Sequence, residues 1–320
     1  MKDYADSHIY DRIAYVLYYF SVLLIFIGIC GNLVSFGVFC SRKFQNTTFS
    51  FYMRVKLIVD TFILLYRLNI FSSKILNWNI VMSSWIFCKF TWYLVYICFS
   101  LSFWILSLFS FDCLIKLANP AKFSFIINSR KFQIITVASI LAFYFVIFLP
   151  FLMNIELNEN RFYKCYIKNI SLHNFYDFLL LFEEIIVLYG LNTIFTVMNI
   201  YFLNKLRRNK IESNGFADSI NIIRESRFAK ISITLNLINF ICHFPLIIFL
   251  IFVRLGQFNF DFLNLFSSKI YILIIIKSGC NLFIYLSFCP IFKEEFFRII
   301  RFKRESKSVS ISNFVLLENE

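Results

Sequence analysis

Long apolar stretches constrain this chain more than any other feature of its sequence. A helix needs roughly 20 consecutive apolar residues to cross ~30 Å of hydrocarbon, and several stretches here reach that length. Open sheets cannot cross a bilayer, because every backbone polar group there must be satisfied within the protein. Of the 320 residues, 59% are hydrophobic and only 16% are charged, which is too little charge for the surface of a soluble domain. The sequence therefore predicts an all-α membrane protein.

Seven stretches have the length of membrane spans, and polar or charged segments separate them. The predicted spans are residues 14–39, 51–72, 86–117, 132–153, 176–204, 229–253 and 266–289. The third is too long for one straight crossing, so we expect it to tilt strongly or to project into the cytosol. The seventh is interrupted by Lys269 and Lys277. The expected fold is a seven-transmembrane helix bundle.

The positions of Lys and Arg predict how the chain is oriented. Most of the 32 basic residues lie in 41–56, 116–131, 205–230 and 293–307, which a seven-span chain places on one side of the membrane. Cytosolic connections carry the excess of Lys and Arg, so we expect an extracellular N-terminus and a cytosolic C-terminus. The polar residues 1–12 and the long first apolar run predict an uncleaved anchor. Because the net charge of +13 comes from this bias, nucleic acid is not an expected partner.

Single polar residues stand inside the apolar spans. Asn32 lies in the first span, Asp60 lies in the second, and Lys277 and Asn281 lie one helical turn apart in the seventh. A charge in hydrocarbon is costly unless it is paired, so each of these residues is a candidate functional residue. The alternative is a lone hydrogen bond between helices, worth about 0.6 kcal/mol.

Three motifs place polar or helix-breaking residues at defined points of the later spans. They are Asp112-Cys113 near the end of the third span with Pro120 eight residues after the acid, Cys242-His243-Phe244-Pro245 in the sixth span, and Asn281-Leu282-Phe283-Ile284-Tyr285 in the seventh. Pro245 removes a backbone hydrogen bond and should kink its helix. His243 and Pro245 are therefore the expected hinge.

With these motifs in register, the chain resembles the rhodopsin-like (class A) G-protein-coupled receptors from about Gly31 to Phe297, as a divergent member. The family reads Asp-Arg-Tyr, Cys-Trp-x-Pro and Asn-Pro-x-x-Tyr at these places, so Cys113, His243 and Leu282 replace its Arg, Trp and Pro. The expected division of the chain is an extracellular N-terminus at 1–13, a seven-transmembrane receptor domain at 14–289, an amphipathic membrane-surface helix at 290–304 and a disordered cytoplasmic tail at 305–320.

The resemblance implies two extracellular modifications. A disulfide is expected between Cys88, which opens the third span, and Cys165 in the second extracellular connection. Asn169, in the sequon Asn169-Ile170-Ser171, is the expected glycosylation site. The other seven cysteines are expected to be reduced packing residues, and neither a metal nor a cofactor is expected.

The resemblance further implies a central polar network and a cytosolic switch. The expected network comprises Asn32, Asp60, Ser102, Lys277, Ser278 and Asn281, and the expected switch for G-protein coupling comprises Asp112, Cys113, Glu225 and Tyr285. We expect the Lys277 ammonium to replace the family's central sodium ion and to pair with Asp60, with Lys56 as its competitor. Because Cys113 replaces the Arg, coupling would rely on other basic residues such as Lys116.

The implied function is that of a plasma-membrane receptor, which binds an extracellular chemosensory cue or peptide and transmits a conformational change to a cytosolic heterotrimeric G protein. The expected ligand pocket comprises Tyr93, Val95, Tyr96, Phe99 and His243, although ordinary helix packing explains any single aromatic residue as well. Val95 in place of an acid disfavours amine ligands, and Ile275 in place of a Lys disfavours retinal. Membrane lipids are the expected partners of the amphipathic helix.

Three other classes of function fit less of the sequence. A transporter or channel would show internal repeats and spans broken by Gly or Pro, whereas the chain has 7 Gly and 4 Pro. A receptor-like protein with lost or weakened coupling fits the missing Arg, Trp and Pro. An enzyme is not expected, because the sequence contains no nucleophile–base or metal-ligand pattern.

Overall fold

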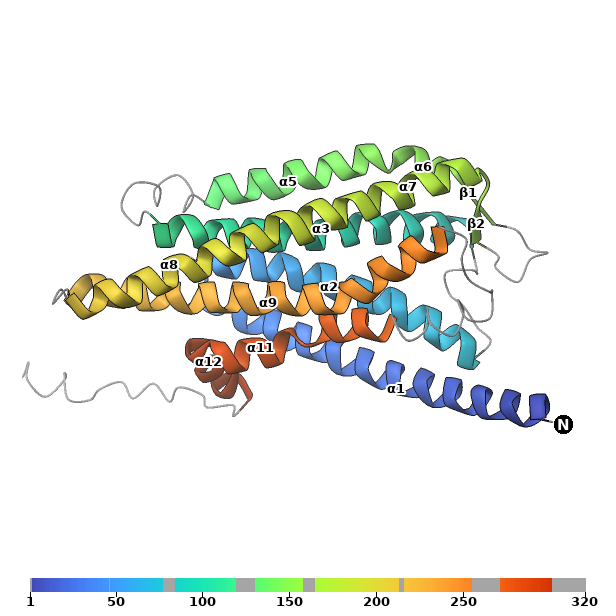
Figure 1. Ribbon diagram of the computed structural model, residues 1–320, viewed down its shortest axis with the longest axis horizontal. Coiled ribbons are helices and arrows are strands. Elements are labelled where there is room, and N and C mark those ends of the chain that lie inside the picture. Colours follow the sequence, from blue (N-terminus) through green and yellow to red (C-terminus); the bar gives the residue numbers. More distant parts are fainter. Residues whose placement is uncertain are drawn as a thin grey trace, which may run out of the picture.

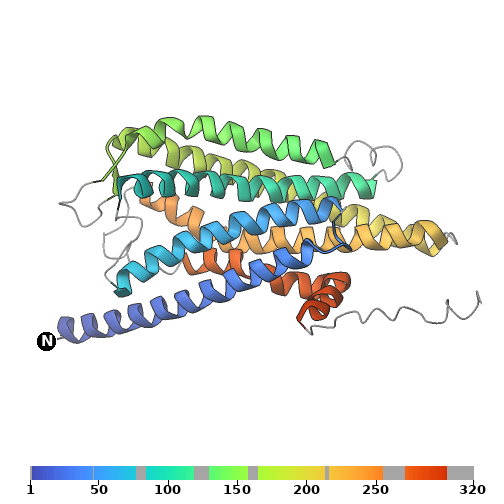
Figure 2. The ribbon, with the colours of Figure 1, turned by 180° about the vertical axis from the view of Figure 1, so that it is seen from behind.

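The computed structural model describes residues 2–45, 47–76, 84–118, 130–157, 165–212, 216–254 and 271–300. Most of it is long helices packed side by side, and a two-stranded hairpin lies at the end of the bundle where the N-terminus is found (Figures 1 and 2).

The elements follow one another along the chain as a series of helices. The first three are α1 (Lys2–Phe39), α2 (Thr48–Leu76) and α3 (Trp85–Ala118). Two composite helices follow: α5 (Arg130–Ile147) with α6 (Leu149–Asn154), and α7 (Ile170–Glu183) with the π-helical segment η2 (Glu184–Leu191) and α8 (Asn192–Glu212). The last are α9 (Phe216–Arg254), the helix Tyr271–Gly279, α11 (Asn281–Phe288) and α12 (Pro290–Ile300).

Five described helical segments are long and apolar enough to cross a membrane. They are Val16–Phe39, Trp85–Ala118, Arg130–Asn154, Asn174–Leu206 and Arg224–Phe249, and the bent pair Tyr271–Gly279 and Asn281–Phe288 would make a sixth. α2 overlaps the predicted second span, but Lys56, Asp60 and Arg67 lower its hydropathy. The described part of the chain thus has the helices of an all-α membrane protein, and a count of seven spans remains a prediction.

α3 forms the centre of the bundle. It packs against α2, α5, α8 and α9, and 67% of its most apolar stretch is buried, compared with 18% for the segment Arg130–Asn154. Apolar side chains of α5 such as Ile135 and Val146 are exposed instead. The long third helix predicted from the sequence is therefore the one that most other helices use as a packing partner.

Aromatic rings join α12 to the bundle. The ring of Phe39, the last residue of α1, lies 5.0 Å from that of Tyr285 in α11 and 5.1 Å from that of Phe292 in α12. Phe292 is fully buried, whereas Phe297 is exposed. α12 therefore has one face on the bundle and an apolar face directed outward.

The predicted ends of the chain are described only in part. α1 begins at Lys2, so residues 2–13 of the predicted extracellular N-terminus are helical and continuous with the first predicted span. α12 covers most of the predicted amphipathic segment 290–304, while residues 301–304 and the predicted tail 305–320 lie outside the described residues.

A short hairpin occupies the connection between the fourth and fifth predicted spans, where the sequence had suggested only a loop. β1 (Ile155–Leu157) pairs antiparallel with β2 (Cys165–Ile167), with Ile155 opposite Ile167. Both strands lie beside α3. The fully buried Ile155 packs with Tyr176 of α7, which fixes the hairpin against the helices.

The last predicted span is a bent helix although Leu282 replaces the proline of the family. The helix Tyr271–Gly279 and α11 meet at an angle of 41°. Sharp kinks without proline commonly occur at Gly/Ser pairs, and Ser278-Gly279 stands at the bend. Gly279 therefore accounts for the bend in the absence of a proline at position 282.

Gly279 also lets this helix approach α1 closely. A Cβ built on Gly28 would lie 2.9 Å from Gly279 Cα and 2.9 Å from Leu64 Cδ1. Small residues at helix interfaces allow such backbone contact, which is a main source of packing between membrane helices.

We predict that Gly28→Ala destabilises the protein by about 1–3 kcal/mol, because the added methyl group has no room against the Gly279 backbone. The measurement is thermal unfolding of the purified protein in lipid nanodiscs. Gly37→Ala on the same helix is the matched control, since a Cβ at Gly37 meets nothing within 4 Å. Equal unfolding temperatures for the two variants would contradict the close contact.

Candidate functional site

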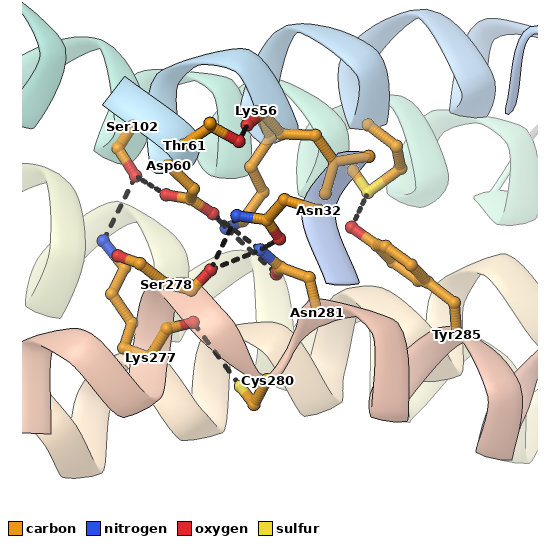
Figure 3. A network of polar contacts seen from close by, with 12 residues as sticks. Asn32, Lys56, Asp60, Thr61, Ser102, Lys277, Ser278, Cys280, Asn281 and Tyr285 are labelled. Carbon is orange, nitrogen blue, oxygen red and sulfur yellow. Dashed lines mark hydrogen bonds and ion pairs between the residues drawn. The ribbon is translucent and has the colours of Figure 1, made fainter. Parts of the chain in front are cut away.

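A polar network lies in the centre of the bundle, between α1, α2, α3 and the bent last helix (Figure 3). Asn281 connects three of these elements. Its Nδ2 donates to Asp60 Oδ2 at 2.8 Å, to Asn32 Oδ1 at 3.1 Å and to the Ser278 carbonyl oxygen at 3.1 Å. Asn32 Nδ2 donates to the same Ser278 carbonyl at 3.1 Å. Asn32, Asp60 and Asn281 are fully buried, so these hydrogen bonds replace contacts with water.

Lys56 provides the positive charge of the network. Its ammonium forms an ion pair with Asp60 Oδ2 and donates to Asn281 Oδ1 at 3.3 Å. Lys56 precedes Asp60 by four residues, which places both side chains on one face of α2. The Lys56 side chain is 1% exposed, so it does not extend to the membrane surface.

Lys277 reaches Asp60 through an intermediate hydroxyl. Its Nζ donates to Ser102 Oγ at 3.1 Å, and Ser102 Oγ donates to Asp60 Oδ1 at 3.4 Å. The ammonium also lies 5.2 Å from the centre of the Phe103 ring, within range of a cation–π interaction. The direct Lys277–Asp60 ion pair expected from the sequence is therefore corrected: Lys56 takes that place, because it lies one turn away on the same helix as the acid.

The structure thus brings all six residues of the expected network together and adds Lys56 to them. Ser278 takes part through its backbone carbonyl, while its Oγ has no hydrogen-bond partner among the described residues. Tyr285, one turn beyond Asn281, is fully buried and donates its hydroxyl to Met53 Sδ at 3.2 Å. This separate contact lies on the α12 side of the network.

The expected switch around Asp112 has a different composition from that of the family. Asp112 Oδ2 accepts hydrogen bonds from Thr48 Oγ1 at 2.9 Å and from Lys116 Nζ at 2.6 Å. Cys113 is 2% exposed and belongs to the apolar core. Glu225 contacts Arg224 at 3.4 Å on its own helix. Lys116 is therefore the cation that pairs with the third-helix acid, while Cys113 is a packing residue.

A cluster of neutral polar side chains joins α3 to α8 and α9 near this switch. Ser110 Oγ lies 2.8 Å from Ser232 Oγ and accepts a hydrogen bond from Asn236 Nδ2 at 2.9 Å. Asn236 Nδ2 also donates to Thr196 Oγ1 at 2.8 Å, and Asn199 Nδ2 donates to the Ser110 carbonyl at 3.1 Å. The sequence interpretation missed this cluster, although single Asn residues in apolar helices were the available signal.

The expected ligand pocket is divided by the structure. Tyr93 donates its hydroxyl to the Phe145 carbonyl at 2.6 Å, and the Tyr96 ring lies 5.6 Å from that of Phe148, so both face α5. Val95 is buried in α3. Phe99, about one turn after Tyr96 and Val95, lies 5.8 Å from the Arg67 guanidinium of α2.

His243 lies apart from those residues as well. It is fully buried in α9, and its ring meets Phe103 edge to face at 5.1 Å. Pro245 lies inside the same helix, two residues further on. The five residues expected to line the pocket thus contact different parts of the bundle: Tyr93 meets α5, Phe99 lies near Arg67 of α2, and His243 of α9 meets Phe103.

A buried carboxylate joins α3, α5 and α7 on the Tyr96 side of the bundle. Glu183 accepts hydrogen bonds from Ser100 Oγ at 2.7 Å and from the Tyr144 hydroxyl. Trp104 Nε1 donates to the same Tyr144 oxygen at 2.6 Å. This cluster was not expected from the sequence; Glu183 in an apolar span was the signal that identifies it.

An apolar groove of about 350 Å³ lies between α1 and α2, on the outer face of the bundle. Its lining includes Leu33, Ile58 and Leu65, which are exposed. The groove therefore differs from the expected ligand pocket in both place and chemistry.

Cys88 is disulfide-bonded in the structure. Cys165 begins β2, which lies beside α3, but its side chain is outside the described part, so the Cys88–Cys165 pairing remains a prediction. Asn169 is exposed just before α7, and its Oδ1 accepts the Leu172 N–H at 3.2 Å. Asn169 is therefore placed where an enzyme could reach it.

The chain was also compared with known proteins. Neither protein-family models nor curated protein sequences contain a match to it. The resemblance to rhodopsin-like receptors therefore remains an expectation from the sequence motifs.

We predict that Lys56→Met destabilises the protein by about 3–5 kcal/mol, because it leaves the Asp60 carboxylate buried without its cation. The double variant Lys56→Met/Asp60→Asn should recover much of this loss. Lys56→Met should also become more stable in sodium than in choline chloride, since sodium would then fill the vacated place. The measurement is thermal unfolding in both salts.

Lys168→Met is the matched control for this experiment. Lys168 is 68% exposed and lies 3.0 Å from Glu156, which is 42% exposed, so its loss should cost only about 0–1 kcal/mol. A wild-type protein that responds to sodium as strongly as Lys56→Met would contradict the role of Lys56 as the built-in cation.

Proposed function

We propose that the chain is a divergent rhodopsin-like G-protein-coupled receptor with seven membrane spans. Its ligand would be an extracellular chemosensory cue or peptide, and its partner a cytosolic heterotrimeric G protein. The observation that carries the proposal is the contact between Asn32, Asp60 and Asn281. These three residues come from three predicted spans, and the family has the same residue types at matching motif positions in its central network.

The proposal also explains why the network includes a bent helix. Signalling needs two packings of one bundle that differ by a few kcal/mol. Asn281 and Ser278 stand at the 41° bend and hydrogen-bond to α1 and α2, so a change in the bend would change these bonds. Pro245 inside α9 provides a second point at which one half of a helix can move relative to the other.

The contacts at the α12 end suggest how such a receptor would be held inactive. Ser110 of α3 is hydrogen-bonded to Ser232 and Asn236 of α9, so neutral hydrogen bonds connect the two helices. In the family, an arginine at the position of Cys113 makes this connection to an acid of the sixth span. We propose that the neutral cluster replaces that ionic contact.

A receptor-like protein without G-protein coupling is the second candidate. The burial of Cys113 in the apolar core favours it, because that position then presents no cation to a partner. Lys116, 10% exposed and paired with Asp112, is the alternative cation near the same surface. Basal signalling separates the two candidates.

The topology is tested with epitope tags at the two ends of the full chain. We predict that antibodies label an N-terminal tag on intact cells and a C-terminal tag only after permeabilisation, as the distribution of Lys and Arg requires. Labelling of both tags on intact cells would contradict an odd number of spans.

We predict that Asn236→Ala raises basal G-protein activation, because it removes the hydrogen bonds to Ser110 and Thr196 that hold α3, α8 and α9 together. The measurement is ligand-free activation in cells across a panel of G-protein classes, at matched surface expression.

Thr234→Ala is the control, since Thr234 Oγ1 donates to the Lys230 carbonyl of its own helix at 2.9 Å. Activation that is above background and rises in Asn236→Ala alone supports the coupled receptor. Background signalling from wild type and both variants would favour the uncoupled candidate.

A further inference from the structure

Arg67 is a buried cation in α2 that has no carboxylate partner among the described residues. It is 7% exposed, and in the described part of the chain its buried Nε has no hydrogen-bond partner. Its guanidinium makes cation–π contacts with three aromatic rings, those of Tyr66, Phe99 and Tyr271. A buried charge without a counter-charge is costly, so its presence needs a physical explanation.

The guanidinium keeps an unsatisfied donor beside the rings, because its Nε has no hydrogen-bond partner among the described residues. Arg67 Cζ lies 4.0 Å from the centre of the Tyr271 ring, which is its nearest aromatic contact. The other two rings are 5.7 Å and 5.8 Å away. The N–H donors of an arginine point outward in the plane of the group, where they form paired hydrogen bonds with a carboxylate.

The cluster of Arg67 and the three rings lies apart from the central network, nearer one end of the bundle. Arg67 follows Asp60 by seven residues, which is about 10 Å along a helix. Tyr271 likewise precedes Lys277, and Phe99 precedes Ser102. All three elements therefore place the cluster beyond the network, toward the end of the bundle that carries the hairpin and the N-terminus.

Among the described side chains, the two buried acids in this half of the bundle have other contacts. Asp60 is paired with Lys56 and bonded to Asn281. Glu183 accepts hydrogen bonds from Ser100 and Tyr144 on the far side of α3. Lys277, one layer deeper, adds a second positive charge below Arg67. The interior near Arg67 is therefore suited to a negative group that the described chain does not supply.

We propose that Arg67, Tyr66, Phe99 and Tyr271 form the binding site for the carboxylate of an organic acid with an apolar, ring-bearing body. The carboxylate accepts the in-plane N–H groups of Arg67, and the body of the ligand packs on the three rings. This proposal names the chemical class of ligand for the receptor proposed above. The proposed site rests on that function only for the ligand's role as a signal.

The test uses the purified full chain in nanodiscs of neutral phosphatidylcholine. The probes are benzoate and 3-phenylpropanoate, with benzamide and 3-phenylpropanamide as neutral counterparts. We expect at least one acid to raise the unfolding temperature in a concentration-dependent way, and its amide to have a much smaller effect. Loss of the charged partner in Arg67→Gln should weaken binding of that acid roughly ten- to hundredfold.

Two further variants make the result specific. Arg67→Lys keeps the charge but loses the planar fork, and should bind the acid with intermediate affinity. Arg54→Gln is the matched control, because Arg54 lies in the same helix and its Nε donates to the Ser50 carbonyl at 3.3 Å. This control should bind the acid like the wild type.

The stability of the empty protein provides an independent readout. Arg67→Gln removes an uncompensated charge, so without probe it should unfold at the same or a higher temperature than wild type. The proposal is overturned if the acid has no larger effect than its amide, or if Arg67→Gln binds the acid like wild type. It is also overturned if Arg67→Gln without probe unfolds at a lower temperature than wild type.

The acid-binding test and the G-protein assay can fail independently of each other. Acid binding without G-protein activation leaves this site intact and counts against the receptor function. G-protein activation in the basal assay without acid binding supports the receptor function and overturns this site.

Discussion

The ion pair between Lys56 and Asp60 is the interaction on which the rest of the structure depends. A carboxylate enclosed by apolar helices is stable only when a cation and further hydrogen bonds compensate for its lost hydration. Asp60 has both, because Lys56 supplies the charge while Asn281 and Ser102 supply hydrogen bonds. Since those partners lie on α3 and on the bent last helix, satisfying one charge also ties three helices together.

Buried charges lie at three places along the bundle, namely its centre, its α12 end and its hairpin end, and their partners differ. At the centre a cation of the chain itself, Lys56, pairs with the buried Asp60 carboxylate. Toward the α12 end Asp112 and Lys116 form a second internal pair, and the α3–α9 connection beside it is neutral. Toward the hairpin end Arg67 lies against three aromatic rings and has no ion pair within the described residues. Charge is thus balanced within the chain at two levels, and a ligand would balance it at the third.

Much of the candidate site was predictable because lone polar residues are costly in hydrocarbon and so stand out in the sequence. Asn32, Asp60 and Asn281 were identified on that ground, and the structure places them in mutual contact. The partner of Asp60 was not predicted correctly. Lys56 and Lys277 are equally visible in the sequence, and only the direction of each side chain shows which ammonium meets the carboxylate. The structure also shows the contacts of Tyr93 with Phe145 and of Tyr96 with Phe148, which the sequence interpretation did not specify.

By itself the sequence determined the class of fold, since runs of apolar residues of that length must be helices in a membrane environment. It also determined where the chain carries its buried charges and its small residues. The tertiary structure alone decided which groups meet: that Gly28 lies against Gly279, that Lys56 pairs with Asp60, and that Arg67 lies over Tyr271. These contacts depend on the rotation and spacing of neighbouring helices, which arise from packing many side chains at once and are not encoded in any single segment.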